Sequence, residues 1–187
     1  MPCRTARAAA LAWLLPLAAA AAQPTEPACA LRLPQPAHEV GAGTLRWFGM
    51  SIYHATLWSG PDGIDSAATE ARPLALRLRY ARFLRGADIA RRSAQLMKGE
   101  ADPARLQQWQ RRMRELFPDV HAGDTLCGVY LAGAPGGPTT LFMAGDRLLG
   151  HIDGADFARA FFGIWLSAGT TEARLRRQLL GLDHGGN

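Results

Sequence analysis

The sequence predicts an α+β domain in which an antiparallel sheet carries helices on one face. Three observations predict this fold class. Apolar and polar residues alternate over several short stretches, other stretches show helical spacing, and short glycine-rich turns join the strands of the second half. Short turns connect antiparallel neighbours, whereas parallel strands need long crossovers. The pattern therefore favours an antiparallel sheet packed against a layer of helices.

A targeting segment precedes this domain. Arg4 and Arg7 form a short positive end, residues 8–19 are apolar apart from one proline, and small alanines close the segment. This run is shorter than the roughly 20 residues that a membrane-spanning helix needs. The pattern is typical of a secretory signal peptide. We therefore predict a signal peptide over residues 1–22, one domain over residues 23–187, a periplasmic location and no stable membrane insertion after cleavage.

The strands of the first half follow from alternation and turn chemistry. Residues 41–58 read as two strands on either side of Gly49, and residues 59–63 form a polar turn. Residues 74–80 alternate between an apolar face and a partly basic one, which is the clearest strand pattern in the chain. We therefore expect three strands before the first helix.

Two helices are expected next. The first is predicted from Gly86 to Met97. The second begins cleanly, because Asp102 can cap the free amides and Pro103 occupies the first turn, where its missing N–H costs little. Its apolar residues at helical spacing predict a core-facing stripe, formed by Leu106, Trp109, Met113 and Leu116.

The second half predicts three strands and then two helices. Glycine-rich hairpin loops separate the strands, and Gly181 ends the last helix. The predicted strands cover residues 125–131, 139–144 and 147–152, and the predicted helices cover residues 156–166 and 171–180.

Charge and cysteine content exclude some functions. The formal charge of +5 loses two arginines with the signal peptide and becomes +3. The remaining arginines follow polar faces, and no base-stacking platform accompanies them, so we expect no nucleic-acid partner. Cys29 and Cys127 remain after cleavage. In an oxidising compartment they form either a disulfide or two separate thiols.

No motif for a cofactor, a metal or a known catalytic apparatus is present. The chain has no P-loop, no dinucleotide fingerprint and no G-x-S-x-G elbow. Its histidines show no paired ligand spacing. We therefore expect no metal and no cofactor. His54, beside Tyr53 on a strand, could act as a base, although a lone histidine on a sheet is more often a hydrogen-bonded neighbour.

Several short motifs nevertheless occur in one order along nearly the whole mature chain. They are Gly41-x-Gly43, Gly49-x-x-Ile52-Tyr53-x-Ala55-x-Leu57, Tyr80, Trp109, Phe117-Pro-Asp-Val120, Gly123-Asp124, Leu149-Gly150-x-Ile152, Phe157-Ala-x-Ala-Phe-Phe-x-Ile-Trp-Leu166 and Leu179-Leu180-Gly181. Together they resemble the secreted bacterial chalcone-isomerase-like family. The resemblance implies an open-faced sandwich, with an antiparallel sheet covered by helices and a ligand between the two layers.

The resemblance also bears on catalysis. Plant chalcone isomerases use an arginine and several hydrogen-bond donors around a developing enolate. Their donor positions match Phe48, Ile89, Leu96 and Ile164 here, their lysine matches Arg92, and their first-strand arginine has no convincing counterpart. Most polar donors have become apolar. We therefore name no catalytic residue and expect a protein without the plant activity, while leaving open whether it is an enzyme.

An apolar cleft disfavours buried charge but suits an acyl chain. The retained guanidinium of Arg92 could bind a carboxylate at the cleft's mouth, with Tyr53 or Tyr80 as the hydroxyl donor. This resembles noncatalytic fatty-acid-binding relatives in the same superfamily. The predicted ligand-binding residues are Arg92, Tyr53, Tyr80, Phe48, Ile89, Leu96 and Ile164. The alternative is that Arg92 is a solvated helix residue and both tyrosines are ordinary core.

Three functions remain in view. The first is an exported binder of a fatty acid or similar amphipathic small molecule. The second is an intramolecular lyase or isomerase that uses the same cleft, with His54 and Arg92, on an unidentified substrate. The third is an envelope protein with a closed cleft, whose surface binds a partner.

Overall fold

The sheet is a six-stranded meander in which every strand pairs antiparallel with its neighbour in sequence, in the order β1-β2-β3-β4-β5-β6. The structure, a computed structural model, describes residues 27–65 and 67–184. The predicted signal peptide, residues 1–22, lies outside the described residues. The strands are β1 (His38–Trp47), β2 (Met50–Ser59), β3 (Leu74–Tyr80), β4 (Thr125–Leu131), β5 (Thr139–Ala144) and β6 (Arg147–Asp153).

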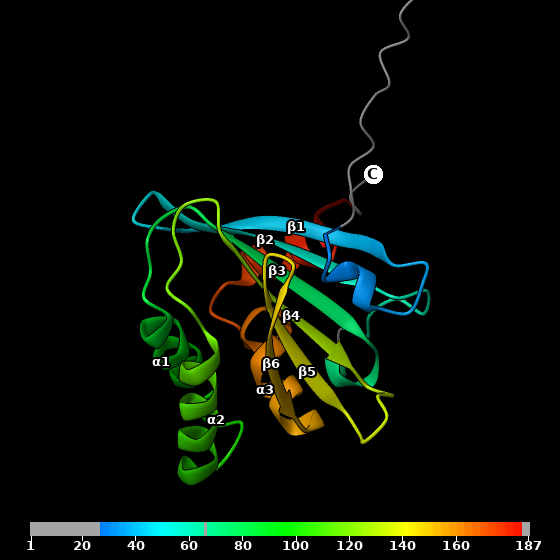
Figure 1. The fold of residues 1–187 in the computed structure, drawn as a ribbon. Helices are drawn as coiled ribbons and strands as arrows, with labels where there is room; N and C mark the ends of the chain where they lie inside the picture. The colour runs from blue at the N-terminus through cyan, green and yellow to red at the C-terminus, as the bar shows by residue number, and fades with distance from the viewer. Residues whose placement is uncertain (1–26, 66, 185–187) are drawn as a thin grey trace, which may run out of the picture.

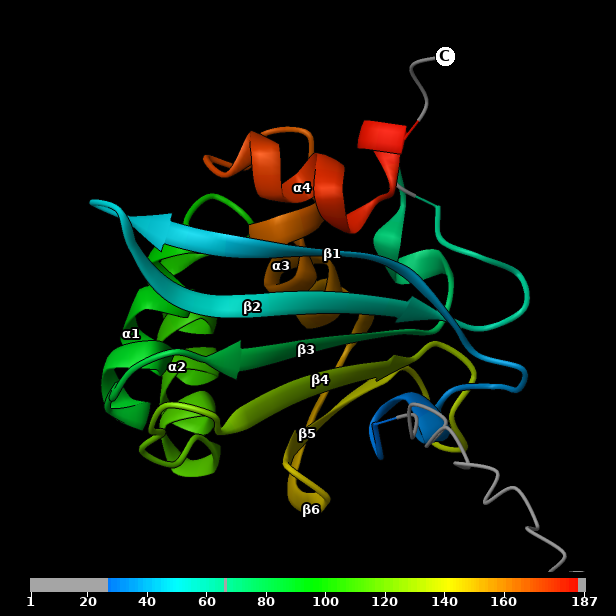
Figure 2. The same ribbon diagram turned by 90° about the horizontal axis from the view of Figure 1, so that it is seen from above.

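The helices pack on one face of this sheet (Figure 1). They are α1 (Gly86–Leu96), α2 (Pro103–Leu116), α3 (Ala155–Leu166) and α4 (Ala173–Leu179). The chain also forms short 3-10 helices, η1 (Ala30–Arg32), η2 (Thr69–Ala71) and η3 (Leu182–His184), of which η1 belongs to a separate core on the opposite face. Figure 2 shows α1 and α2 side by side at the end of the sheet where β1 turns into β2, and α4 along β1. The α+β open-faced sandwich predicted from the sequence is confirmed.

The main core lies between the sheet and the helices. Helix α3 contributes most of it, because its aromatic side chains Phe157, Phe161, Phe162 and Trp165 are all buried. The ring of Phe142 on β5 packs edge-on against Phe157 and Phe161, with centroid distances of 6.1 and 5.2 Å. Such edge-to-face pairs add to the stabilisation that burial alone provides. Helix α3 is therefore anchored against the middle of the sheet.

A second, smaller core covers the opposite face of the sheet. Here the segment around η1 places Ala30 and Leu33 against Trp58 and Val129. A disulfide joins Cys29 to Cys127 on β4, with 6.4 Å between their Cα atoms. Of the two possibilities that the sequence left open for these cysteines, the structure shows the disulfide. The N-terminal segment is thereby held on the face that the helices leave free.

Two glycines on β1 allow α4 to lie directly on the strand. A Cβ atom on Gly41 would collide with the backbone carbonyl oxygen of Gln178 and lie 2.8 Å from that of Leu179. A Cβ atom on Gly43 would lie 2.7 Å from a methyl carbon of Leu175. The Gly41-x-Gly43 motif therefore has a steric cause, since a side chain at either position would force helix and strand apart.

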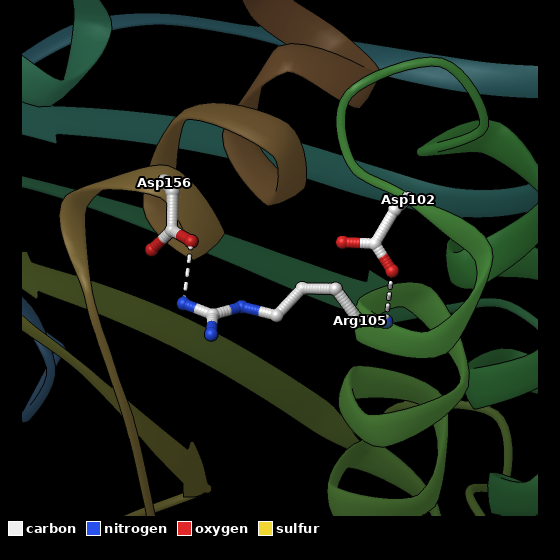
Figure 3. A network of polar contacts seen from close by, with 3 residues as sticks. All are labelled: Asp102, Arg105 and Asp156. Atoms are coloured by element: carbon white, nitrogen blue, oxygen red, sulfur yellow. Dashed lines mark hydrogen bonds and ion pairs between the residues drawn. The ribbon is translucent and has the colours of Figure 1, made fainter.

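The helix pair α1–α2 is tied to the rest of the domain by carboxylates. Asp102 accepts hydrogen bonds from the amides of Ala104 and Arg105, as its predicted cap requires. The Arg105 guanidinium then bonds Asp156 in the first turn of α3 at 2.7 Å (Figure 3). Asp119 accepts from the amide of Gly86 at 2.9 Å and so satisfies the start of α1. These contacts join α2 to α3 and fix the start of α1 to the loop that follows α2.

Candidate ligand-binding site

A cavity of about 620 Å³ lies between the sheet and the helices α1 and α3. Its volume falls within the roughly 300–1,000 Å³ of small-molecule sites in proteins. Most of its wall is apolar. The sheet contributes Leu76, Leu78 and Leu126, and the helices contribute Ile89, Leu96, Phe161 and Ile164. A cavity of this kind suits a largely apolar ligand.

Close approach between α3 and β4 shapes one wall of the cavity. At Gly128 of β4, an added Cβ atom would lie 3.3 Å from ring carbons of both Phe161 and Phe162. The glycine therefore lets the aromatic rings rest directly on the strand. Gly128 was not among the residues predicted from the sequence. Its position inside an otherwise apolar strand was the available signal, since an interior strand glycine often marks such a contact.

All but one of the predicted ligand-binding residues lie on the cavity wall. Those that line it are Tyr53, Tyr80, Ile89, Arg92, Leu96 and Ile164. The structure brings them together from two strands and two helices, as the resemblance implied. That they contact a ligand stays a prediction.

Phe48 is the exception, and its expected place in the cleft is corrected by the structure. It occupies the two-residue turn between β1 and β2 with Gly49, and its side chain is 84% exposed. A residue in a turn faces neither side of the sheet, so the position cannot line a cavity between layers. The neighbouring Trp47, the last residue of β1, lines the cavity instead.

Tyr53 on β2 is the best-defined polar group of the cavity. Its hydroxyl accepts a 2.8 Å hydrogen bond from the indole N–H of Trp165 on α3. Burial raises the pKa of Tyr53 to about 12, and the negative charge of Glu172 adds to this increase. The hydrogen bond from Trp165 and the positive charge of Arg92 oppose it. The phenol therefore stays neutral at physiological pH. Since the bond from Trp165 uses an acceptor site of the hydroxyl, its own proton can be donated to a ligand.

Tyr80 on β3 lies next to Tyr53. The two rings are edge-on with their centroids 5.9 Å apart, and Tyr80 is buried. Burial raises the pKa of Tyr80 well above its ordinary value, and the neighbouring Tyr53 adds to this. The cavity therefore contains two adjacent neutral phenols. A pair of neutral hydroxyl donors can solvate an oxygen atom that an otherwise apolar wall cannot.

Charged side chains gather on the helix side of the cavity and at the α3–α4 loop. Arg91 pairs with Asp88 at 3.0 Å, so these two charges largely compensate each other. Arg92 is exposed, lines the cavity and makes no ion pair among the described residues. Glu172 lies on the same wall, and both charges act on the Tyr53 hydroxyl. The guanidinium of Arg92 is therefore available to an anionic ligand group.

His54 does not belong to this cavity. Its Nδ1 lies 3.0 Å from the Thr44 hydroxyl on β1, and its partners across the sheet are Thr44 and Arg79. Successive strand residues point to opposite faces, so the strand that turns Tyr53 into the cavity turns His54 away from it. The expectation that His54 and Arg92 share one cleft is therefore wrong.

Two further properties of residues 27–65 and 67–184 concern metals and membranes. No group of three or more histidine, cysteine or acidic side chains in this part of the chain is arranged to hold a metal ion. The helices found there are all too short or too polar to span a bilayer.

Comparisons with known proteins agree with this architecture. A protein of Haemophilus influenzae, described as uncharacterized, is 30% identical over 146 residues, which cover 76% of this chain and 67% of that protein. The crystal structure of an Arabidopsis thaliana fatty-acid binding protein superposes with a TM-score of 0.58 at 9% identity and covers 79% of this chain and 88% of its own. At that identity the similarity establishes the fold alone. The family model described as chalcone isomerase-like matches residues 40–181, so this chain belongs to the chalcone isomerase-like family.

Proposed function

We propose that this protein is an exported, noncatalytic binder of a fatty acid or a similar amphipathic small molecule. The observation that carries the proposal is the composition of the cavity, which is about 620 Å³ of mostly apolar space with two neutral tyrosine hydroxyls on its wall. Two guanidinium groups on the same wall, those of Arg46 and Arg92, form no ion pair among the described residues. The similarity in fold to a protein described as fatty-acid binding supports it.

The apolar wall would hold the acyl chain. Each methylene group removed from water contributes about 0.8 kcal/mol, so a chain of ordinary length supplies enough free energy to offset the entropy that binding costs. The contacts would come from aliphatic residues on both layers, namely Leu76, Leu78, Leu126, Ile89 and Ile164. A polar ligand of the same size would leave its polar groups unpaired against this wall.

The carboxylate would lie among Tyr53, Tyr80 and Arg92. An ionised carboxylate enters a cavity cheaply only where hydrogen bonds and an opposite charge replace its water. Tyr53 has a proton to donate, Tyr80 is adjacent, and the exposed Arg92 keeps its charge in contact with solvent while it lines the cavity. Glu172 disfavours a second negative charge on this wall, which favours a ligand with a single carboxylate over a dicarboxylate.

The lyase or isomerase hypothesis has one observation in its favour. Two adjacent neutral phenols could stabilise an enolate oxygen, as donors in an oxyanion hole do. Against it, His54, the candidate base that the sequence offers, lies outside the cavity, and its Nδ1 is within hydrogen-bond distance of the Thr44 hydroxyl. The open cavity also argues against the third possibility, a protein whose cleft is closed.

Mass spectrometry tests the proposal. The protein would be purified from the periplasmic fraction of cells that express the full chain, and analysed natively and after solvent extraction. We expect one fatty acid per protein in the wild type and a loss of most of it in Arg92→Ala. Arg111→Ala is the matched control, because Arg111 is an exposed arginine of α2 that does not line the cavity.

Two results would count against this proposal. A wild-type protein that neither retains lipid nor binds added fatty acid would contradict carrier function. Equal lipid content in Arg92→Ala and Arg111→Ala would show that Arg92 does not contribute to binding, although the cavity could still be the site. The same experiment tests export, because the intact mass of the periplasmic protein shows whether residues 1–22 have been removed.

A further inference from the structure

The turn between β1 and β2 presents an unusual group of exposed apolar side chains beside the cavity. Trp47 is 62% exposed, Phe48 is 84% exposed and Met50 is also exposed. The rings of Trp47 and Phe48 lie 4.9 Å apart. We call Trp47, Phe48, Gly49 and Met50 the hairpin tip. Figures 1 and 2 both show the hairpin tip projecting beyond the rest of the sheet, at the end where α1 lies.

The backbone of the hairpin tip shows that Phe48 is not there for the sake of the fold. Phe48 has a φ of 46° and Gly49 a φ of 77°. A two-residue turn with positive φ at both positions favours Asn, Asp or Gly at the first, since these residues tolerate the left-handed conformation. A bulky aromatic residue there is strained. Its side chain is almost fully in water, so burial does not compensate for that strain, and such outliers point to function.

Two guanidinium groups are held against the hairpin tip. Arg46 donates to the Gly49 carbonyl oxygen at 3.4 Å, and Arg82 lies 3.8 Å from the sulfur of Met50. Neither arginine forms an ion pair among the described residues. The half-exposed Phe83 follows Arg82 in the loop after β3. The exposed apolar surface is thus flanked by two guanidinium groups that no acidic side chain pairs directly in the part of the chain that the structure describes.

This combination matches the chemistry of an anionic lipid surface. Exposed aromatic rings partition into the boundary between headgroups and acyl chains, while arginines bind the lipid phosphates, and the two contributions together give reversible binding without a spanning helix. A protein partner would need a matching apolar pocket lined by acids, whereas a bilayer needs no such complement.

The hairpin tip is also continuous with the cavity. Arg46 and Trp47 line the cavity wall as well as flanking or forming the tip. We infer that the hairpin tip docks on the surface of an anionic membrane and brings the mouth of the cavity to the bilayer, so that the amphipathic ligand passes between membrane and protein without crossing water. The transfer of a ligand rests on the proposed function, whereas the docking itself rests only on the features of the hairpin tip.

Flotation with vesicles tests the docking. The protein purified from cells that express the full chain would be mixed with vesicles of phosphatidylethanolamine and phosphatidylglycerol at three to one, or of pure phosphatidylcholine. We expect the wild type to float with the anionic vesicles and much less with the neutral ones. Binding should weaken as salt is raised, because counter-ions screen the arginines.

Phe48→Asn is the decisive variant. Asn suits the left-handed turn, so the fold is expected to be kept or stabilised, while the affinity for anionic vesicles should fall about tenfold, as for the loss of one buried apolar side chain. Arg82→Gln should weaken vesicle binding a few-fold and reduce the salt dependence of that binding.

Leu31→Asn is the matched control, because Leu31 is an exposed apolar residue of η1 on the opposite face of the sheet.

The outcomes separate this inference from the proposed function. Fatty-acid content would be measured on the same samples by extraction, and Phe48→Asn should keep it, since Phe48 does not line the cavity. A wild type that carries lipid but does not float, or a Phe48→Asn variant that floats like the wild type, overturns the docking alone. A wild type that floats but never carries lipid overturns the proposed function alone. If the wild type does not float but self-associates, and Phe48→Asn abolishes this association, the hairpin tip binds a second copy of the chain. That result also overturns the inference.

Discussion

The indole N–H of Trp165 on α3 and the hydroxyl of Tyr53 on β2 form a 2.8 Å hydrogen bond between residues 112 positions apart in the sequence. This bond links the helix layer to the sheet at the cavity. It also leaves the Tyr53 hydroxyl proton free to point elsewhere, because the hydroxyl oxygen is the acceptor in the bond from Trp165. Trp165 thus positions a hydroxyl group that the proposed ligand would contact.

The variant Trp165→Phe removes the donor and keeps an aromatic ring. We expect it to lower the free energy of unfolding by about 1 kcal/mol from the lost hydrogen bond, with a further cost for the missing ring atoms, and to weaken fatty-acid binding several-fold. Urea unfolding and a competition assay measure the two effects. Trp109→Phe is the control, since Trp109 is buried against Phe157 but does not line the cavity. A similar loss of affinity in both variants would contradict a positioning role.

The two buried phenols predict a loss of stability in alkali. Burial raises the pKa of Tyr53 from 10.0 to about 12. The unfolded chain therefore releases the phenol proton at a lower pH than the folded one, and the folded state loses stability as pH rises from about 10 to 12. For Tyr53 alone the linkage amounts to at most about 3 kcal/mol.

Denaturant unfolding at several pH values measures this loss. Below pH 10 the stability of the wild type should not depend on Tyr53 titration. Tyr53→Phe should show a shallower fall between pH 10 and 12, and the remaining fall reflects Tyr80 and Tyr130, whose pKa values burial also raises. Parallel pH curves for wild type and variant would show that Tyr53 titrates like a free phenol.

The close approach of α4 to Gly41 on β1 predicts that a single added methyl group destabilises the fold. In Gly41→Ala the new Cβ atom would collide with backbone carbonyls of α4, which cannot rotate away. We expect a loss of about 1–3 kcal/mol in unfolding free energy, as for overpacked cores. Gly133→Ala is the control, because nothing lies within 4 Å of its added Cβ atom and its φ is not positive. Thermal unfolding of the two variants measures the difference, and equal melting temperatures for Gly41→Ala and Gly133→Ala would contradict the prediction.

The disulfide predicts a dependence of stability on redox state. Cys29 and Cys127 are 98 residues apart, so the cross-link restricts a long loop in the unfolded chain. We expect reduction, or the double variant Cys29→Ala with Cys127→Ala, to cost about 2–5 kcal/mol. Urea unfolding with and without reductant measures this in the wild type. The double variant should not respond to reductant, and a wild type that is equally indifferent would contradict the prediction.

The sequence by itself determined the elements and their kind. The strand alternation of residues 74–80, the cap at Asp102 and the short turns of the second half each depend on neighbours within a few positions, and each predicted element is present in the structure. Of the predicted cavity residues, Tyr53 and Tyr80 belong to the family motifs, and Arg92 is the position that matches the lysine of the plant enzymes. The order of these motifs reflects the fold, and no local pattern marks those residues as a group.

The tertiary structure alone decided which side chains share the cavity. Strand residues alternate between faces, so a shift of one position moves a side chain to the other side of the sheet. That is why His54 lies outside the cavity while Tyr53 lies inside it. Phe48 is outside for a different reason, because it occupies the turn after β1, and Trp47 lines the wall instead. The bond from Trp165 to Tyr53 and the contact of Gly41 with α4 likewise join residues far apart in the chain. Such contacts follow from the packing of whole layers, which no short stretch of sequence encodes.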